Sequence, residues 1–292
     1  MKIALIPNVD KPDAVAAAER LGEVLSAESI AVELLDSPTR DVLAALCPNL
    51  VVVLGGDGSI LKIAHAMIGI DAPVAGINFG KLGYMAAFSF EQFRRYLPAI
   101  LRSELPITQR TMLHGAIYRL PHETTDIPPL SQLLHSAPTF DYLALNDVAL
   151  NAGEPFRMIE LEVQIDGHAT APFRSDGVIV ATATGSTGYN LSAGGPLISP
   201  EVQALVLTPI CPHSLSFRPV VVADTSTIVI RGVRLNTGSR INFDGQISQP
   251  ITEQDCVVVR RAAAPLRLLE NPEMSHWGML AHKLHWAQSP RG

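Results

Sequence analysis

The chain has few cysteines and no long apolar run, which argues against a disulfide-stabilised or zinc-binding fold and against a membrane-spanning protein. Its three cysteines, Cys47, Cys211 and Cys256, are far apart and odd in number, so they fit neither a disulfide framework nor a zinc site. We interpret them as small hydrophobic residues in a reducing compartment, and we expect a cytoplasmic protein. No apolar run approaches the roughly 18 residues that span a bilayer. The N-terminal apolar stretch is too short for a secretory signal, so no membrane partner is expected.

Charge and signature motifs are also sparse. Charged residues make up 17% of the chain and the net charge is −6, which argues against a nucleic-acid partner. An anionic small molecule could still bind through local donors and helix N-termini. The motifs HExxH, paired CxxC and GxSxG do not occur, so metalloprotease, zinc-ribbon and serine-hydrolase functions have no support. We predict no metal site built from protein ligands alone.

The pattern of apolar residues divides the 292-residue chain into three parts. Strand-like and helix-like stretches alternate over residues 1–105, which predicts an α/β domain with a parallel sheet. Residues 106–262 hold mainly strand-like stretches separated by turns, which predicts an all-β, sandwich-like domain. Within it, the proline-rich residues 121–138 are expected to form an exposed loop. In residues 263–292, helical spacing over residues 275–286 predicts a closing helix that docks on the body of the protein.

A glycine-rich turn, Gly-Gly-Asp-Gly at residues 55–58, follows the apolar stretch 50–54 and opens a helix. In open α/β sheets ligands bind at this edge, where glycine allows close backbone approach and positive φ. Asp57 there could accept a proton from an attacking hydroxyl group or hold a metal. Alternatively, Asp57 or Ser59 only caps the helix. Lys62 could reach an anion or be a solvated surface lysine.

A second run of small residues spans residues 184–196. Its hydroxyl and backbone N–H groups, with the ring of Tyr189, suit the polar edges and the face of a nucleoside. The alternative is a long irregular surface loop. Together the two turns suggest a nucleotide-handling site built from two regions of the chain.

Asn146 and Asp147 interrupt an apolar stretch that we predict as one strand over residues 140–150. Successive side chains of a strand point to opposite faces, so at least one of the two is buried, and a buried carboxylate needs a partner. Ribose hydroxyls would be suitable partners, whereas a bulge with both residues bonded to backbone is the alternative. The Asp-Gly pair at residues 244–245 predicts a hairpin turn.

These motifs occur in an order that resembles the NAD kinases, which phosphorylate NAD to NADP with ATP or polyphosphate. The Gly-Gly-Asp-Gly turn alone is weak support, because lipid kinases and phosphofructokinases carry similar turns. Its combination with Thr-Gly-Ser-Thr-Gly-Tyr-Asn-Leu-Ser-Ala-Gly-Gly-Pro is highly specific. The matches cover nearly the whole chain and lie at residues 55–58, 78–84, 145–147, 174–200, 207–216, 244–246 and 283–286.

The resemblance implies that Asp57 accepts the proton of the adenosine-ribose 2′-hydroxyl. It also implies Mg²⁺ or another divalent cation with the donor, a last helix that returns to the first domain, and a homodimer or homotetramer. From this resemblance and the chemistry above, the residues predicted to bind NAD are Asp57, Gly58, Lys62, Asn146, Asp147, Arg157, Arg174, Asp176, Thr187, Gly188, Tyr189, Asn190, Leu191, Ser192 and Gln246.

Four departures from the family pattern bear on substrate preference. Thr-Gly-Tyr-Asn at residues 187–190 stands where Thr-Ala-Tyr-Ser is usual, Phe79 where leucine is usual, and Phe217 where asparagine or alanine is usual. The stretch 121–138 is longer than is common. Two alternative functions stay open: an NAD-binding regulatory paralogue without turnover, and a kinase that uses the same turn on a lipid or sugar hydroxyl.

Overall fold

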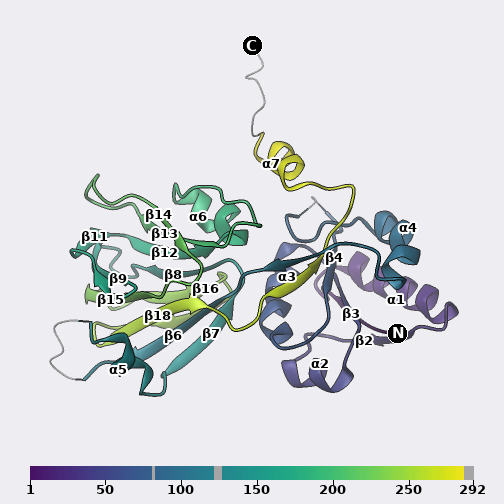
Figure 1. The fold of residues 1–292 in the computed structure, drawn as a ribbon, viewed down its shortest axis with the longest axis horizontal. Helices are drawn as coiled ribbons and strands as arrows, with labels where there is room; N and C mark the ends of the chain where they lie inside the picture. Colours follow the sequence, from purple (N-terminus) through teal and green to yellow (C-terminus); the bar gives the residue numbers. More distant parts are fainter. Residues whose placement is uncertain (81–82, 122–126, 286–292) are drawn as a thin grey trace, which may run out of the picture. The chain divides into compact units, whose positions relative to one another are not determined.

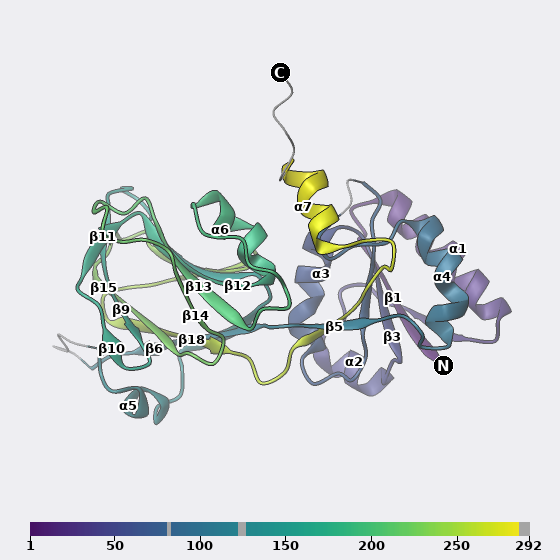
Figure 2. The ribbon, with the colours of Figure 1, turned by 45° about the horizontal axis from the view of Figure 1, so that its top comes forward.

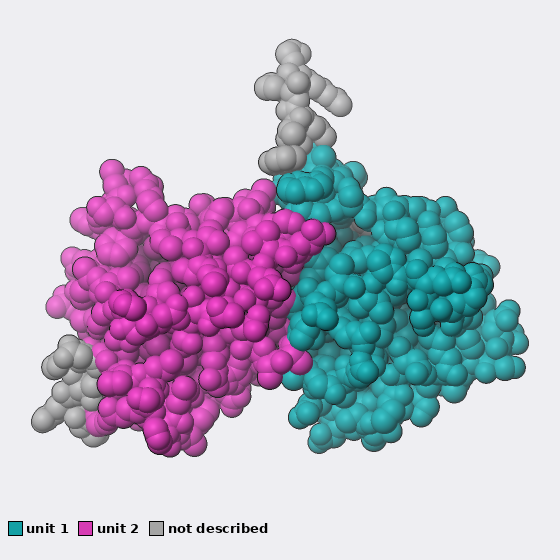
Figure 3. All heavy atoms as spheres, viewed as in Figure 1, with its two compact units in different colours: residues 1–110, 265–292 teal, residues 111–264 magenta. Residues whose placement is uncertain are grey.

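A computed structural model describes residues 1–80, 83–121 and 127–285. The chain divides into two compact units, residues 1–110 with 265–292 and residues 111–264 (Figure 3). The predicted class is confirmed: an α/β unit with parallel strands, a β-rich unit, and a C-terminal helix in the first unit. Within the described ranges, no helix combines the length and the apolar character needed to cross a bilayer.

The first unit is built on a six-stranded sheet in the order β2-β1-β3-β4-β19-β5 (Figure 1). The strands are β1 (Lys2–Pro7), β2 (Ala31–Leu34), β3 (Leu50–Leu54), β4 (Val74–Ile77), β5 (Ile107–Arg110) and β19 (Leu266–Leu269). The first four are parallel to one another, as predicted. The helices are α1 (Pro12–Ala27), α2 (Arg40–Leu46), α3 (Asp57–Ala64), α4 (Phe90–Leu101) and α7 (His276–Leu284), with a short 3₁₀ turn η1 (His65–Met67).

Helices cover both faces of this sheet. The apolar stripe of α1, with Leu21 and Leu25, and that of α4, with Phe93 and Leu97, are buried in one cluster with side chains of β1, β3 and β4. Figures 1 and 2 show α2 and α3 on the other face of the sheet. The helix-sheet-helix layers bury the strands on both sides, as their nearly continuous apolar sequences require.

Strand β19, which sequence reasoning missed, brings the C-terminal segment back into the first unit. It pairs with β4 in the parallel sense and with β5 in the antiparallel sense. Beyond it, Asn271 donates a hydrogen bond to the carbonyl of Ala87, and Glu273 accepts hydrogen bonds from Gln92 and Arg95 of α4. Strand β5, beyond the boundary expected at residue 106, therefore belongs to the first sheet.

The second unit contains two sheets. One has the order β10-β9-β15-β18-β6-β7, with β11 paired to β9, and the other β14-β13-β12-β8-β16-β17. A single apolar core draws on both sheets, with Ile117 and Ile230 from one and Leu150 and Val180 from the other, which confirms a sandwich. The strands are β6 (Leu113–Arg119), β7 (Phe140–Ala144), β8 (Asp147–Asn151), β9 (Ile159–Ile165), β10 (His168–Ala169), β11 (Phe173–Ser175), β12 (Gly177–Thr182), β13 (Ala204–Ile210), β14 (Val220–Ala223), β15 (Ile228–Arg234), β16 (Arg240–Phe243), β17 (Ile247–Pro250) and β18 (Asp255–Arg261).

The single strand predicted over residues 140–150 is wrong. The chain leaves β7, which belongs to the first of these sheets, at Ala144 and enters β8 of the other sheet at Asp147. Leu145 and Asn146 form the crossing between the sheets. The apolar pattern runs on through the break because both strands face the same core, so periodicity alone did not reveal it.

The prediction of an exposed loop over residues 121–138 is also wrong for the residues of this segment that the structure describes. Residues 122–126 lie outside the described residues. Residues Leu130–Leu134 form a short helix, α5. Ile127 and Leu133 are buried in a cluster with Tyr118 of β6. The apolar residues of the segment thus cover the outer face of the sheet that contains β6.

Phe243 of β16 links the two sheets of the second unit, and its removal should be costly. The ring is fully buried, lies 5.7 Å from the Phe140 ring, and occupies space left open by Gly115. We expect Phe243→Ala to lower the free energy of unfolding by about 3–5 kcal/mol. Val202→Ala, at a half-exposed position that precedes β13, should stay within about 0.5 kcal/mol. Urea unfolding followed by circular dichroism measures both, and equal midpoints would contradict this assignment.

Candidate active site

Asp57 is the first residue of α3, but its side chain does not cap that helix. Gly56 occupies the N-cap position, and no side chain bonds there. Instead, the Asp57 carboxylate accepts three backbone hydrogen bonds from the segment after β4. Oδ2 accepts from the N–H of Tyr84 at 2.8 Å, and Oδ1 accepts from Met85 at 3.0 Å and Ala86 at 2.9 Å. The helix-cap alternative for Asp57 is therefore wrong, and the carboxylate is fixed by neutral donors.

Two of the four glycines around Asp57 are needed because a side chain would have no space. A Cβ on Gly83 would lie 1.9 Å from Oδ1 of Asp57, and one on Gly55 would lie 2.2 Å from Oγ of Ser59. Gly56 and Gly58 have nothing within 4 Å of the Cβ position. Gly55, Gly56 and Gly58 do not have a positive φ. The open space at Gly56 and Gly58 suits the close approach of a ligand.

The amine of Lys283 on α7 lies beside this carboxylate. Its Nζ is 3.8 Å from Oδ2 of Asp57 and 4.3 Å from the centre of the Tyr84 ring. Burial raises the pKa of the Tyr84 hydroxyl, and the negative charge of Asp57 adds to the shift. Residues 81–82 of the predicted 78–84 motif and residue 286 of the last motif lie outside the described residues.

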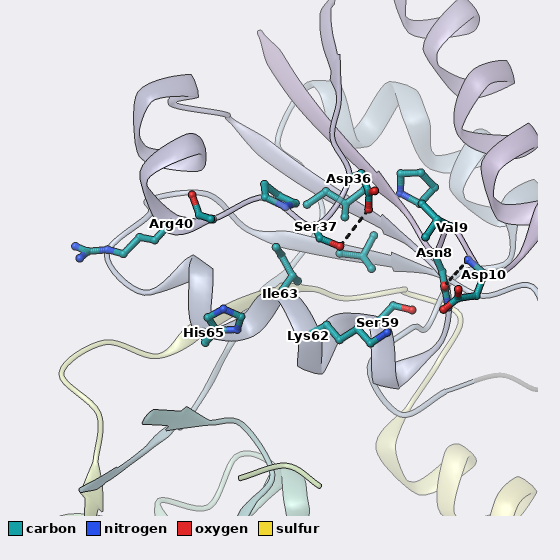
Figure 4. Close-up of a pocket in the computed structure, with 15 residues that line it drawn as sticks. Asn8, Val9, Asp10, Asp36, Ser37, Arg40, Ser59, Lys62, Ile63 and His65 are labelled. Atoms are coloured by element: carbon teal, nitrogen blue, oxygen red, sulfur yellow. Dashed lines mark hydrogen bonds between the residues drawn. The ribbon is translucent and has the colours of Figure 1, made fainter. Parts of the chain in front are cut away.

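A cavity of about 380 Å³ opens at the carboxyl ends of β1 and β3 (Figure 4). Lys62 and Ser59 of α3 line it opposite residues of the β1 and β2 loops, and Asp36 there accepts a hydrogen bond from Ser37. Burial lowers the pKa of His65, a further lining residue. The lining residues are Ile6, Pro7, Asn8, Val9, Asp10, Asp36, Ser37, Pro38, Thr39, Arg40, Val53, Ser59, Lys62, Ile63 and His65. The cavity occupies the edge of the sheet where α/β proteins bind ligands.

In the second unit, the carboxylate of Asp244 organises the crossing between the sheets. Its oxygens accept hydrogen bonds from the N–H groups of Leu145 at 2.8 Å, Asn146 at 2.7 Å and Asp147 at 3.0 Å. Asp244 and Gly245 have φ values of 53° and 64° in the hairpin between β16 and β17, which confirms the predicted turn. Sequence reasoning missed the role of Asp244, because the Asp-Gly pair was already explained as a turn.

Asp147 is the buried member of the Asn-Asp pair, with 5% of its surface exposed, while Asn146 is half-buried. Burial raises the pKa of Asp147 to about 7, and the charge of Asp244 contributes further. Burial also raises the pKa of Asp244, against the three N–H donors that lower it. The alternative of bonding to backbone holds in part: the carbonyls of Asn146 and Asp147 accept backbone N–H groups, whereas their own N–H groups donate to the Asp244 carboxylate.

The run of small residues at 184–196 forms a 3₁₀ turn η2 (Thr184–Thr187) and a short helix α6 (Tyr189–Ser192). It lies directly against the Asn-Asp pair, because a Cβ on Gly185 would be 2.0 Å from the Asn146 carbonyl oxygen. Ser192 and Tyr189 are exposed, and the Tyr189 hydroxyl accepts a hydrogen bond from Asn151. Of the other predicted contacts in this run, Thr187, Gly188 and Leu191 are half-buried.

Asn190 differs from its neighbours in the run because it has no exposed surface. Its amide donates to the carbonyls of Ser186 and Pro196 and accepts from the Thr208 hydroxyl at 2.6 Å. A Cβ on Gly195 would lie 1.9 Å from its Oδ1. In this conformation Asn190 braces the loop internally and offers no surface for the predicted NAD contact.

The remaining predicted contacts are exposed residues of the second unit. Arg174 lies on β11, and Asp176 between β11 and β12. Arg157 follows β8, and its carbonyl accepts a hydrogen bond from Asn236. Gln246 follows Gly245 in the hairpin that carries Asp244. The hairpin therefore brings Gln246 near the Asn-Asp pair, and the NAD contacts of all four stay predictions.

Comparison with known proteins identifies the family. Residues 39–105 match the ATP-NAD kinase N-terminal domain, and residues 145–271 match the ATP-NAD kinase C-terminal domain. The NAD kinase of Syntrophotalea carbinolica is 36% identical over 82% of this chain and 79% of its own length. The chain belongs to the NAD kinase family. An NAD kinase is a phosphotransferase with a nucleotide substrate, so two of the sequence-based predictions, family and enzyme class, are confirmed.

Solved NAD kinase structures share the fold. An NAD kinase from Archaeoglobus fulgidus in complex with ATP has a TM-score of 0.73 and 26% identity, covering 94% of this chain and 95% of its own. Yeast NADH kinase complexed with NADH has a TM-score of 0.86 and 24% identity, covering all of this chain and 89% of its own. The two-unit architecture described above is thus that of the family.

The buried carboxyl group of Asp147 should make the free energy of unfolding depend on pH. The folded state holds the Asp147 proton more tightly than the unfolded state, so stability present at low pH is lost as pH rises through about 7. Asp147→Asn removes this titration. Between pH 5 and pH 8 the free energy of unfolding of the wild type should fall by roughly 2–3 kcal/mol relative to the variant. Urea unfolding at both pH values tests this, and parallel pH curves would refute it.

Proposed function

We propose that the chain transfers a phosphoryl group from ATP or polyphosphate to the 2′-hydroxyl of the adenosine ribose of NAD, giving NADP. The fixed carboxylate of Asp57 carries this proposal. Its two oxygens have about four acceptor positions, and three backbone N–H groups occupy three of them. Oδ2 receives only one of these bonds, so it keeps a position for a hydroxyl donor. The Asp57 side chain is 27% exposed, which leaves that position accessible.

Asp57 in this position orients the attacking hydroxyl and takes its proton. Phosphoryl transfer depends mainly on positioning and on stabilising charge, so a carboxylate held by three rigid donors is suited to the task. Because the donors are backbone groups, the carboxylate does not need to reorganise when the hydroxyl arrives. General-base assistance of this kind contributes about 10²–10⁴-fold.

The Asn-Asp pair of the second unit binds the dinucleotide. Asp244 fixes the backbone of both residues, which frees their side chains for ligand contacts. An ionised Asp147 carboxylate can accept hydrogen bonds from two ribose hydroxyls, and these donors would replace the water that burial has removed. Gly188 and Tyr189 lie in the adjacent loop, and the half-exposed Tyr189 ring offers a stacking face.

The donor binds in the cavity at the carboxyl ends of β1 and β3. Apolar walls from Val9, Pro38 and Ile63 suit a base, while Lys62 supplies charge for phosphate. This placement favours a donor contact for Lys62 over the predicted NAD contact. That a related NAD kinase is known in complex with ATP supports a nucleotide donor.

A divalent cation fits this site only in company with the donor. No group of three or more histidine, cysteine, aspartate or glutamate side chains could hold a metal within residues 1–80, 83–121 and 127–285. Mg²⁺ commonly binds through one or two carboxylates and the substrate phosphates, and Asp57 and the cavity residue Asp10 are carboxylates of this unit. When bound, the cation neutralises phosphate charge.

We further propose a homo-oligomer in the cytoplasm. Strand β14 is at the edge of its sheet and exposes Val220 and Val221 by 45% and 50%. An exposed apolar edge strand is a template for pairing with a second chain. Light scattering of the purified protein distinguishes a dimer or tetramer from a monomer.

The Asp57→Asn variant tests the proton acceptor. Asparagine can keep the two hydrogen bonds to Oδ1 but loses the one from Tyr84, so we expect a stability loss of about 1 kcal/mol. The fall in kcat should be far larger, about 10²–10⁴-fold, with the Kd for NAD changed less than threefold. Steady-state assays with NAD, Mg²⁺ and ATP or polyphosphate, read by an NADP-specific dehydrogenase, measure kcat, and calorimetry measures Kd.

Asp13→Asn is the matched control for Asp57→Asn, since Asp13 is an exposed aspartate in the first turn of α1 in the same unit. Its kcat should equal that of the wild type. A near-normal kcat for Asp57→Asn would refute the base. NAD binding without NADP formation in the wild type, with NADH also inert, would favour the regulatory paralogue, and turnover of a lipid or sugar hydroxyl would favour the other kinases.

The Lys62→Met variant tests the donor site. Removing the amine while keeping the stem should raise the KM for ATP about tenfold, roughly the 1.4 kcal/mol of a charged contact, and leave the Kd for NAD unchanged. Lys11→Met alters an exposed lysine outside the cavity lining and should change neither. If Lys62→Met instead weakened the binding of NAD, the sequence-based prediction that Lys62 contacts NAD would be correct.

A further inference from the structure

The side chain of Lys283 places a positive charge where the reaction proposed above needs one. Its Nζ lies 3.8 Å from Oδ2 of Asp57, the oxygen with a free acceptor position. A hydroxyl oxygen bonded to Oδ2 at about 2.7 Å is therefore at most about 6.5 Å from Nζ. The flexible stem of lysine can cover the remaining distance once a phosphate arrives.

The contact between Lys283 and Asp57 is not needed to hold either residue in place. Three backbone N–H groups already fix the carboxylate. Helix α7 is anchored by its buried Met279 and Leu280 and begins at the Ser275 cap. Nζ and Oδ2 are 3.8 Å apart, which is beyond hydrogen-bond distance, and each side chain keeps about a quarter of its surface exposed, so the pair adds little to stability. A structural purpose for the amine is thus poorly supported.

The Tyr84 ring helps to keep the amine in position while about a quarter of the lysine side chain stays exposed. Nζ lies 4.3 Å from the ring centre, within the range of a cation–π contact. The ring itself is half-buried, and its hydroxyl has no hydrogen-bond partner among the described residues. Ring and carboxylate together keep a mobile side chain beside Oδ2, while about a quarter of it stays open to a ligand.

Phosphoryl transfer places negative charge on the oxygens of the group in flight, and cations that meet this charge accelerate the reaction. A phosphoryl group that moves onto a hydroxyl held by Asp57 passes beside Lys283. The bond from the donor oxygen to phosphorus breaks as the bond from the hydroxyl oxygen forms, the hydroxyl proton passes to Asp57, and the donor leaves with its bonding electrons.

We infer that Lys283 is a further catalytic residue, which contacts the phosphoryl group during transfer and exchanges its ion pair with Asp57 for the phosphate oxygens. This inference rests on the proposed function, because it requires a hydroxyl acceptor at Asp57. It also gives the C-terminal helix a part in the chemistry.

The test compares Lys283→Met and Lys283→Arg with His282→Gln, an exposed neighbour on the same helix. Methionine keeps the stem and removes the charge. We expect Lys283→Met to lower kcat about 100-fold, with the KM for NAD and for ATP changed less than threefold. Lys283→Arg should recover at least a tenth of the wild-type kcat, and His282→Gln should match the wild type. If Lys283→Met also disturbs the helix, the activity that Lys283→Arg recovers shows how much of the loss is due to the missing charge.

The outcomes separate the two proposals. If the wild type forms no NADP from NAD with ATP or polyphosphate, the proposed function fails. If the wild type is active, the role of Lys283 is overturned by a wild-type kcat in Lys283→Met, by an effect confined to KM, or by equal losses in the arginine and methionine variants. A loss in kcat alone that arginine partly restores supports it.

Discussion

The candidate site depends on one interaction used twice: a carboxylate that accepts hydrogen bonds from the backbone N–H groups of three consecutive residues. Asp57 binds the segment after β4 in this way, and Asp244 binds the crossing between β7 and β8. In both places the chain lacks regular strand partners, so its N–H groups need acceptors. A carboxylate satisfies three of them at once. Each unit thus fixes an irregular functional segment through a charged side chain from another part of the chain.

The elements of the first unit could be predicted well from the sequence, because helices and strands there have clear periods. The alternation predicted over residues 1–105 is confirmed in the order β1, α1, β2, α2, β3, α3, β4 and α4. Strand β19 could not be found, since four apolar-rich residues at the end of a β domain do not indicate which sheet they join. The break at Leu145 was hidden for a related reason: both sheets share one core, so burial is continuous across the crossing.

The sequence predicted those site residues whose type is unusual for their local surroundings. Asp57, Asn146 and Asp147 stood out as polar residues in apolar or glycine-rich surroundings. Asp244 and Lys283 did not, because each has an ordinary local explanation, a hairpin and a polar helix position. Asn190 failed in the opposite sense: its sequence neighbours suggest a ligand contact, yet its amide is buried in the loop. Only three-dimensional neighbours separate these cases.

The order of strands in the first sheet also constrains how the protein is made. Strand β19 lies between β4 and β5, so the neighbours on either side are synthesised more than a hundred residues before the strand that joins them. Residues 111–264 form a continuous unit, and all of its strands are synthesised before β19. Domains generally fold as they emerge. Residues 111–264 are thus able to fold first, and the sheet that carries the glycine-rich turn lacks one strand until β19 has been synthesised.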